Sequence, residues 1–298
     1  MILKPKLSII IPTFNRSGLL KETLRSVMRS SFSDFEILVI DDCSNTDELC
    51  VIEKTVRSFD KAKIYYNEGK KGANACRNIG LGHASGDWIQ FLDSDDLVEA
   101  SKFELQISVS EEADVVLGGG KTFSSENSNT ELEKWMDTPE GYESSSVEEQ
   151  SSMYLERKFR WPTAGPIFRK DFIEGIGAFP ESLASCQDWE FFLRVICASP
   201  RYARPPQNAF CFYRDDHSPD RMKNRWKTKL SRLSQIESRV IGRETLRRVG
   251  SLTPRHRMSL SAYFSALSDD LFDQRWIFFS AAFKLERSFR YAVKSKET

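Results

Sequence analysis

The sequence predicts an α/β fold, in which helices flank a mixed and mostly parallel sheet, followed by a helical appendage at the C-terminal end. Two observations support this prediction. Short apolar, β-branched runs alternate with segments of helical periodicity over roughly the first hundred residues, as in repeated βα units. The apolar run at residues 86–92 also delivers three carboxylates to its own C-terminal end, where parallel sheets present their ligand sites.

The N-terminal segment predicts a first strand that ends in polar residues. Residues 7–12 have the sequence LSIIIP, and such an almost wholly apolar run is typical of a strand buried on both faces. Proline has no N–H to give to a ladder, so Pro12 is expected to end this strand. Thr13, Phe14 and Asn15 are then left at the C-terminal edge of the sheet.

Two more βα units are expected downstream. Residues 18–30 have helical spacing and lead into a strand at residues 35–40, which runs on to Asp42. A third strand at residues 64–66 precedes the segment 69–78, whose glycines and cations open a helix. The free N–H groups and the dipole of such a helix start suit a phosphate group, and a solvated turn is the alternative.

The exit from the run at residues 86–92 is the most informative feature of the chain. Asp93, Asp95 and Asp96 lie so close in sequence that their mutual repulsion is costly unless a cation compensates it. We expect Asp96 to cap a helix that begins near Leu97. Capping explains one carboxylate only, so Asp93 and Asp95 are predicted to have another role.

Five segments, in order, resemble the pattern of glycosyltransferase family 2 on the GT-A fold. They are LSIIIPTFNR, VIDDCSNTD, GANACRN, GDWIQFLDSDD and CQDWEFFLR, which extend over residues 7–194, about two-thirds of the chain. The resemblance implies an inverting, metal-dependent glycosyltransferase of the hexosyltransferase type. It would move a sugar from a nucleotide diphosphate sugar, expected to be a UDP-sugar, to a hydroxyl of a glycan acceptor in cell-surface polysaccharide or glycoconjugate synthesis.

The same resemblance implies a set of nucleotide-binding residues. The set consists of Pro12, Thr13, Phe14, Asn15, Asp42, Arg77 and Asp93. Within it, Thr13 and Phe14 would border the base and Asp42 would hydrogen-bond the base edge. Arg77 would lie near the nucleotide, and Asp93 would lie by the ribose and the metal.

The resemblance also implies a metal site and a catalytic base. Asp95 would bind the divalent cation, Mn²⁺ or Mg²⁺, with Asp93 and His217 as further ligands, since carboxylate oxygens suit these hard ions. Asp188 would act as the base, at the start of an apolar helix where desolvation increases basicity. The residue before the base is commonly Glu in the family and is Gln187 here, which alters how the base is tuned. A plain carboxylate at a helix N-terminus is the alternative for Asp188.

The region after the acidic motif should select the acceptor. Residues 124–152 are polar and acidic, so they are expected to form a mobile excursion, either an acceptor lid or a tolerated surface insertion. Trp161 is expected either to stack on a sugar face or to lie in the core. Residues 212–217, FYRDDH, resemble the family's Tyr-Arg-x-His segment with the histidine one place later. Arg214 would then contact phosphate and His217 would complete the metal or diphosphate site, unless the histidine lies in an exposed loop.

A formal net charge of zero hides an asymmetry along the chain. Residues 221–298 contain 18 Lys and Arg against 7 Asp and Glu, whereas residues 1–220 contain 25 against 36. We therefore expect a GT-A domain over residues 1–220, with a nucleotide-sugar half at 1–96 and an acceptor half at 97–220. Residues 221–298 are expected to form a basic helical segment.

The last helical stretch of the sequence is amphipathic. Its basic stripe consists of Lys284, Arg287, Arg290 and Lys294, and its aromatic stripe of Phe272, Trp276, Phe279 and Phe283. Such a helix suits an anionic membrane surface, where a lipid-linked glycan acceptor would be found, and packing on the acidic domain is the alternative. Nucleic acid is not an expected partner, because no recognised binding module accompanies the charge.

Composition favours a soluble cytoplasmic enzyme, and the two C-terminal stripes add the expectation that it is peripheral on the inner face of the membrane. The sequence contains no signal-peptide pattern and no apolar run of spanning length. The six cysteines have neither metal-site spacing nor the density of a secreted scaffold, and are expected to be reduced. Two other functions are considered. One is a non-catalytic nucleotide-sugar-binding or scaffold protein on the same fold, and the other is a nucleotidyltransferase, whose N-terminal glycine and lysine motif is not found.

Overall fold

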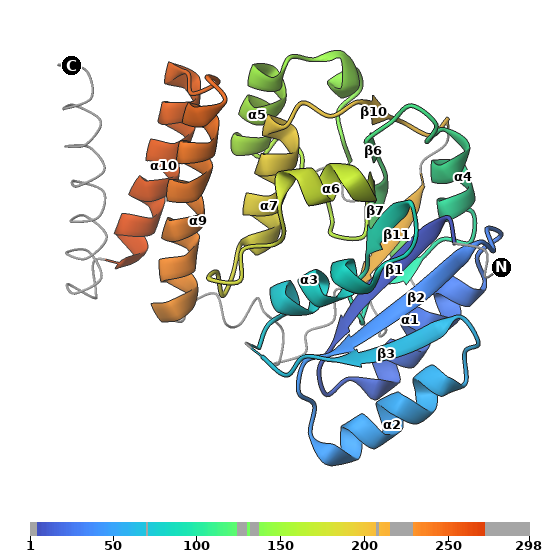
Figure 1. Cartoon of the computed structure of the whole chain (residues 1–298). Helices are drawn as coiled ribbons and strands as arrows, with labels where there is room; N and C mark the ends of the chain where they lie inside the picture. The colour runs from blue at the N-terminus through green and yellow to red at the C-terminus, as the bar shows by residue number, and fades with distance from the viewer. Residues whose placement is uncertain are drawn as a thin grey trace.

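Helices pack on both faces of a central sheet in this computed structural model (Figure 1). The structure describes residues 5–69, 71–123, 130–131, 137–206, 209–214 and 229–271. The strands are β1 (Leu7–Thr13), β2 (Phe35–Asp41), β3 (Ala62–Tyr66), β4 (Trp88–Phe91), β5 (Leu97–Val98), β6 (Val115–Val116), β7 (Gly119–Phe123), β8 (Thr130–Glu131), β9 (Ile167–Arg169), β10 (Tyr202–Ala203) and β11 (Phe210–Arg214). The helices are α1 (Ser17–Met28), α2 (Thr46–Arg57), α3 (Ala73–His83), α4 (Lys102–Ser108), α5 (Val147–Leu155), α6 (Lys170–Ile176), α7 (Gln187–Cys197), α9 (Lys229–Arg248) and α10 (Pro254–Leu271), with a 3₁₀ turn, η2, at Tyr142–Ser144.

Within the described residues, the central sheet has seven strands in the order β10-β6-β9-β4-β1-β2-β3. The neighbours β4, β1, β2 and β3 are all parallel, and β9 runs antiparallel to both β4 and β6. A second sheet has the order β5-β11-β7-β8. The predicted mixed, mostly parallel α/β architecture is therefore confirmed, and the C-terminal ends of β1, β2 and β4 lie at one edge.

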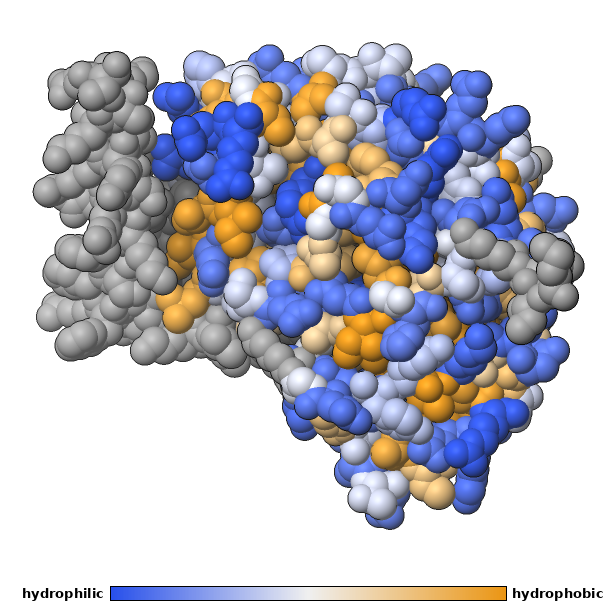
Figure 2. Space-filling model, viewed as in Figure 1, coloured by the Kyte–Doolittle hydropathy of each residue, from blue (hydrophilic) through white to orange (hydrophobic). Residues whose placement is uncertain are grey.

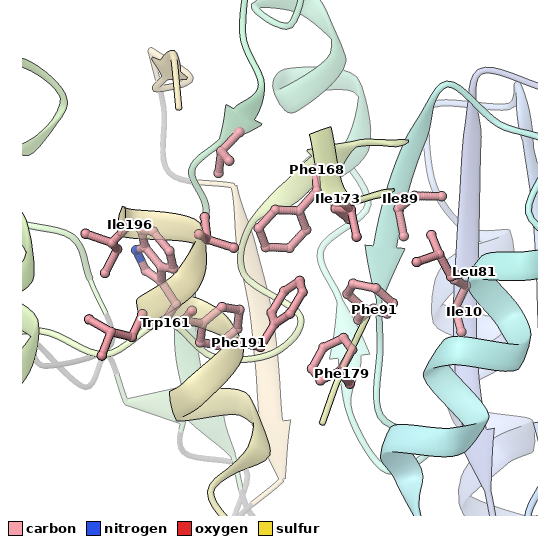
Figure 3. Close-up of a cluster of buried hydrophobic side chains, with 14 of the residues drawn as sticks. Ile10, Leu81, Ile89, Phe91, Trp161, Phe168, Ile173, Phe179, Phe191 and Ile196 are labelled. Atoms are coloured by element: carbon pink, nitrogen blue, oxygen red, sulfur yellow. The ribbon is translucent and has the colours of Figure 1, made fainter. Parts of the chain in front are cut away.

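Residues of β1 alternate between two cores because successive side chains of a strand point to opposite faces. Ile9 and Ile11 pack with apolar residues of α1 and α2 in one cluster. Ile10 packs with Cys76 and Leu81 of α3 in the other cluster, which also takes in the aromatic side chains of α7 (Figure 3). Burial on both faces explains the continuous apolar runs in the sequence.

β1 extends one residue beyond its predicted end, so the expectation that Pro12 ends the strand is wrong. On the edge that faces β4, the carbonyl of Ile10 accepts a hydrogen bond from the N–H of Leu92 at 3.0 Å, and the register with β4 ends there. Pro12 lies two residues further along the same edge, so its missing N–H costs no bond of that ladder. On the other edge, Thr13 still pairs with Asp41 of β2.

The expected helix near Leu97 does not form, and the prediction that Asp96 caps it is wrong. Leu97 begins β5, which pairs with β11 from far along the chain. The carboxylate of Asp96 accepts a hydrogen bond from the N–H of Arg214 at 3.2 Å, so it joins the acidic turn to β11. The next helix, α4, begins only at Lys102.

The polar segment at 124–152 is anchored in its second part, contrary to the expectation of a mobile excursion. Residues 124–129 and 132–136 lie outside the described residues. Tyr142 is fully buried, and its ring meets that of Trp161 edge-on at 6.0 Å between centroids. Tyr142 is the buried apolar side chain among the described residues of this segment, and α5 begins at Val147.

Trp161 is a core residue, so the sugar-stacking alternative is wrong. Its side chain is 1% exposed, and its Nε1–H donates to Oγ1 of Thr138 at 2.9 Å. Its ring lies edge-on to those of Tyr142 and Phe192, at 6.0 and 5.5 Å between centroids. A buried indole needs both an apolar surround and a partner for its N–H, and both are present here.

Helices α9 and α10 pack beside α5 and α7, on the side of the molecule away from β3 (Figure 1). Gly242 of α9 lies so close to α7 that an added Cβ would stand 2.7 Å from Cδ2 of Leu193. Arg255 of α10 pairs with Glu149 and Glu156 at the ends of α5. The predicted helical appendage is therefore present, and its described part packs on α5 and α7 of the same chain.

The two stripes predicted to bind a membrane, between Phe272 and Lys294, lie outside the described residues. Among the helices described, none combines the length and apolar character needed to cross a bilayer. On the face shown in Figure 2, hydrophilic residues are mixed with small apolar groups. The large apolar side chains exposed on the described surface are Phe14, Val51, Tyr66, Val249 and Met258. They come from separate elements, and Phe14 is the one at the C-terminal edge of β1.

Candidate active site

The ends of β2 and β3 and the start of α3 are joined by Asp42. Its N–H donates to the carbonyl of Thr13 at 2.8 Å. Its carboxylate accepts from Nδ2 of Asn67 at 2.7 Å and from the N–H of Gly72 at 2.9 Å. A carboxylate anchored beside the N-terminus of α3 is favoured by the helix dipole, so Asp42 is fixed where the sequence predicted nucleotide binding. Sequence reasoning missed Asn67, the polar residue directly after β3.

Two buried polar atoms next to Asp42 have no hydrogen-bond partner in the described part of the chain. They are Oγ1 of Thr13 and Oδ1 of Asp41, each on a residue that is 2% exposed. The other carboxylate oxygen of Asp41 accepts from the N–H of Ser44 at 2.9 Å. Buried polar groups are costly when unpaired, so this edge favours a ligand with its own polar edge. Asp41 was missed by sequence reasoning, although it pairs with Thr13 across β1 and β2.

Phe14 and Asn15 continue from β1 into the loop before α1. Phe14 is 41% exposed, and Nζ of Lys71 lies 5.5 Å from the centre of its ring. Asn15 has a φ of 48°, a left-handed conformation that asparagine tolerates. Its N–H donates to Oγ of Ser44 and its Oδ1 accepts from the N–H of Asn45, both at 2.9 Å. The two loops at this edge are thereby fixed to each other.

An arginine faces the first carboxylate after β4. Nη2 of Arg77 donates to Oδ1 of Asp93 at 2.6 Å, and the arginine side chain is 4% exposed. The face of the guanidinium lies 5.2 Å from the ring centre of Phe179. Nε and Nη1 of Arg77 are buried and lack partners among the described residues. Arg77 and Asp93, which the resemblance implies as two separate nucleotide-binding residues, are therefore in contact with each other.

A second arginine, which sequence reasoning missed, faces the next carboxylate. Nη1 of Arg16 donates to Oδ2 of Asp95 at 2.9 Å. Arg214 holds the same turn from β11, since its Nε donates to the carbonyl of Asp95 at 3.0 Å and its Nη2 contacts Glu22 at 2.5 Å. Arg214 is 5% exposed, so in this structure it anchors the acidic turn. His217 lies outside the described residues.

Asp188 lies in the first turn of α7, whose buried face carries Phe191 and Phe192. Its Oδ1 accepts from the N–H of Trp189 at 2.8 Å, and its Oδ2 lies 3.9 Å from Nη2 of Arg160. The side chain is 30% exposed, so the carboxylate reaches solvent from a helix that is otherwise packed into the core. Gln187, which replaces the Glu that is common before the base in the family, lies beside Asp188 and is 6% exposed.

Helix α3 links the segment that leads to Asp188 with the nucleotide side. Nδ2 of Asn74 donates to the carbonyls of Pro180 and Leu183, each at 2.9 Å. Nδ2 of Asn78 donates to the carbonyl of Phe179 at 3.0 Å, and Arg77 lies between these two asparagines in the sequence. The helix that carries Arg77 is thereby bonded to the loop that precedes α7.

The donor set at the end of β4 fits the divalent cation that the resemblance implies. No group of three or more His, Cys, Asp or Glu side chains gathers to hold a metal in the described ranges. Asp93 and Asp95 are two oxygen donors, and Mg²⁺ is commonly held by one or two carboxylates together with the phosphates of a substrate. The residues present therefore suit a metal that arrives with a diphosphate.

Two cysteines lie beside Asn67, since Sγ of Cys43 donates to its carbonyl at 2.9 Å and Sγ of Cys76 accepts from its Nδ2 at 3.9 Å. All six lie within the described residues as free thiols. Burial, with the nearby Asp42 carboxylate, raises the pKa of the Cys76 thiol, so it stays protonated and is a poor nucleophile.

Comparison with known proteins gives a family and a fold. A sequence model described as Glycosyl transferase family 2 matches residues 8–176. The chain is 43% identical over 93 residues to GalNAc(5)-diNAcBac-PP-undecaprenol beta-1,3-glucosyltransferase of Campylobacter jejuni, covering 31% of this chain and 30% of that protein. It is 40% identical over 103 residues to UDP-Glc:alpha-D-GlcNAc-diphosphoundecaprenol beta-1,3-glucosyltransferase WfgD of Escherichia coli, covering 34% of this chain and 40% of that protein. The chain therefore matches less than half the length of either relative.

Two solved structures share the fold. TarS 1–349 of S. aureus in complex with UDP-GlcNAc has a TM-score of 0.62 at 22% identity, over 84% of this chain and 72% of that one. The mannosyltransferase PcManGT of Pyrobaculum calidifontis, in complex with GDP-Man and Mn²⁺, has a TM-score of 0.59 at 17% identity, over 97% and 76%. At these identities the likeness concerns the fold alone, and it confirms the predicted GT-A fold.

Proposed function

The chain belongs to glycosyl transferase family 2, and we propose that it is an inverting, metal-dependent glycosyltransferase that moves a sugar from a UDP-sugar to a hydroxyl of a glycan acceptor. The observation that carries the proposal is the pair Asp93 and Asp95 at the end of β4, where Arg77 already contacts Asp93 at 2.6 Å. Such a pair of carboxylates, next to cations and a helix N-terminus, suits a nucleotide diphosphate and its metal.

The nucleotide is bound at the edge formed by β1 and β2. The unpartnered Oγ1 of Thr13 and Oδ1 of Asp41 support a polar base edge there. Phe14 offers an exposed ring to the base, and Asp42 fixes the start of α3 through the N–H of Gly72. The buried donors of Arg77 face the ribose or the diphosphate. Pro12 and Asn15 shape this loop and act through its backbone.

Asp93 and Asp95 would hold a divalent cation, Mn²⁺ or Mg²⁺, with His217 as a proposed third ligand. When bound, a cation of this kind stabilises the negative charge that develops on the leaving diphosphate. The chain's own contribution is to keep two carboxylates at one strand end and to anchor their turn through Arg214, whose Nε donates to the carbonyl of Asp95.

Asp188 is the general base of the reaction. It takes the proton of the acceptor hydroxyl while that oxygen attacks the anomeric carbon of the donor. The new carbon–oxygen bond forms as the bond to the phosphate oxygen breaks, and UDP leaves with the electron pair. Attack on the face opposite the leaving group inverts the anomeric centre. Solvent exposure of 30% for the Asp188 side chain supports access by an acceptor.

The acceptor is a glycan or a lipid-linked glycan. Support comes from the two relatives, whose names specify undecaprenol-linked acceptors. We propose that the enzyme works in the cytoplasm, peripheral on the inner face of an anionic membrane, with residues 221–298 as the docking segment and residues 1–220 as the GT-A domain. Co-sedimentation with anionic vesicles across a salt series tests this. Protein that stays in the supernatant at low salt would exclude it.

The central proposal is tested by calorimetry with UDP, with and without Mn²⁺, on the parent protein and on Asp95→Ala. Tight binding that requires both Mn²⁺ and Asp95 is expected. The matched control is Asp60→Ala, which removes an exposed carboxylate outside the site. Equal UDP affinity with chelator and with Mn²⁺ would contradict metal dependence. A panel of nucleotide sugars, followed by turnover, then identifies the donor and separates an enzyme from a non-catalytic binding protein.

A further inference from the structure

Each carboxylate to which we assign a chemical role faces an arginine, and the arginines differ in burial. The pairs are Arg77 with Asp93, Arg16 with Asp95, and Arg160 with Asp188, at 2.6, 2.9 and 3.9 Å. The arginine side chains are 4%, 33% and 49% exposed, respectively. The Arg77 guanidinium is therefore enclosed, although its partner Asp93 is 33% exposed, whereas the guanidinium groups of Arg16 and Arg160 are more exposed.

Arg16 has a fixed backbone and a loosely held side chain. Its carbonyl accepts from the N–H of Leu20 at 2.9 Å. The N–H of Ser17 donates to Oε2 of Glu48 at 2.9 Å, and Asn15 is bonded to the neighbouring loop. Within the described residues, the guanidinium makes one contact, a single N–H to Oδ2 of Asp95. Exchange of the Asp95 contact therefore requires movement of the Arg16 side chain and none of its backbone.

A structural arginine of the same protein shows the contrast. Arg194 bonds both carboxylate oxygens of Glu190, at 2.7 and 3.0 Å. It also donates to the carbonyls of Ile176, Gly177 and Ala178. Such a two-pronged, multiply bonded guanidinium has little freedom. Arg16 has none of these extra bonds, so its pair with Asp95 can be exchanged at low cost.

Resting on the function proposed above, we propose that Arg16 is a mobile counter-ion that makes cation binding at Asp95 depend on the nucleotide. Without a donor, its positive charge compensates Asp95 and repels a divalent cation from that carboxylate. When the cation arrives with a diphosphate, the guanidinium moves from Asp95 to a phosphate oxygen, where it adds to affinity. Metal and nucleotide thereby strengthen each other's binding, and by linkage the effect is reciprocal.

The test measures binding of two probes, Mn²⁺ alone and UDP at saturating Mn²⁺, to the parent and to Arg16→Gln. The variant should bind Mn²⁺ alone at least about fivefold more tightly and UDP with Mn²⁺ at least about fivefold more weakly, since coupling between two ligands typically spans about 5- to 150-fold. Electron paramagnetic resonance of free Mn²⁺ gives the first affinity, and calorimetry gives the second. Neither readout depends on turnover.

Two variants control the measurement. Arg25→Gln removes an exposed charge from α1, the same helix that Arg16 precedes, and should leave both affinities unchanged. Arg16→Lys keeps the charge and should keep Mn²⁺ affinity near that of the parent. If Arg16→Gln leaves Mn²⁺ affinity unchanged while Asp95→Ala abolishes it, the counter-ion proposal is overturned, and the assignment of Asp95 to the metal stands. If neither variant changes Mn²⁺ affinity, the assignment of Asp95 to the metal fails as well.

Discussion

The donor side and the base side of this site are built in different ways. On the donor side, Thr13 is the last residue of β1, and Asp42 and Asp93 come within two residues of the ends of β2 and β4, which are parallel to it. On the base side, the loop before α7 is held by α9, since the N–H of Ala184 donates to Oγ of Ser234 at 2.9 Å. The first arrangement follows from local sequence, and the second needs segments that are distant along the chain.

The ring of Trp189, next to Asp188, is held by side chains from helices other than α7. The guanidinium of Arg239 on α9 lies 3.7 Å from its ring centre, and the ring of Tyr154 on α5 stacks on it at 6.0 Å. Arg239 is in turn 4.1 Å from the ring centre of Tyr263 on α10. Three helices thus fix the residue that follows the proposed base, whereas α7 alone would leave it exposed.

The change with the largest expected effect should impair catalysis on the base side and leave nucleotide binding on the donor side intact. In Asp188→Asn, transfer is expected to fall about 10²- to 10⁴-fold, the usual loss when a general base is removed, while UDP affinity is unchanged. Asp171→Asn is a matched control, because Oδ1 of Asp171 accepts from the next N–H, of Phe172, at 2.8 Å, as Asp188 does from Trp189. Near-normal transfer by Asp188→Asn would place the base elsewhere.

A second change tests whether the base side depends on its aromatic core. Trp161→Ala should lower the free energy of unfolding by about 3–5 kcal/mol, as for other large buried aromatic side chains. Thr138→Val, which leaves the indole N–H without its partner, should cost about 1–3 kcal/mol. Urea unfolding measures both. Unchanged stability with a raised acceptor KM would instead restore the sugar-stacking role for Trp161.

A third change acts on the contact between α9 and α7. The added methyl of Gly242→Ala would stand 2.7 Å from Leu193 and 2.9 Å from Trp189, so overpacking should cost about 1–3 kcal/mol and lower kcat without changing UDP affinity. In Gly82→Ala of α3 the same methyl meets nothing within 4 Å, and stability should rise by about 0.5–1 kcal/mol. Equal behaviour of the two variants would show that α9 does not constrain α7.

The smallest expected effect is a change in stability with pH, which comes from a buried lysine bonded to both β4 and α4. Nζ of Lys102 is fully buried and donates to Oε1 of Gln90 on β4 and of Gln106 on α4, each at 2.6 Å. Gln106 continues the network to the carbonyl of Gly165 at 3.0 Å. Burial lowers the pKa of Lys102 to about 7. The network therefore holds a lysine that gives up its proton near neutrality.

The free energy of unfolding should depend on pH because Lys102 has a lower pKa in the folded protein than in the unfolded chain. Above about pH 7 the folded protein has lost the Lys102 proton, while the unfolded chain keeps it up to its ordinary pKa near 10.5. Stability should therefore rise with pH in this window, by about 1 kcal/mol between pH 7 and 8. Chemical unfolding at both values measures it, and Lys102→Met should remove the rise. The same slope in both proteins would assign the dependence to another group.

The sequence predicts the features that depend on local patterns and misses those that depend on contacts between distant segments. The strand ends carrying Thr13, Asp42 and Asp93, and the helix carrying Asp188, are predictable because each depends on a local pattern. The helix expected near Leu97 fails because β5 pairs with β11, a partner that no local pattern reveals. Arg16 and Asn67 are missed for a similar reason. Their roles depend on which loops meet at the sheet edge, and single polar residues in loops carry no period.

The contact of Gly242 with α7 has a consequence for the order in which the protein is made. The strands that carry the donor site emerge from the ribosome first and can pair with near neighbours, whereas α7 precedes the helix that covers it. Until α9 is synthesised, Trp189 and Leu193 lack the cover that Gly242 and Arg239 of α9 provide in the full chain. The segments that anchor the donor side, up to Arg214, are therefore synthesised before α9, which covers the base side.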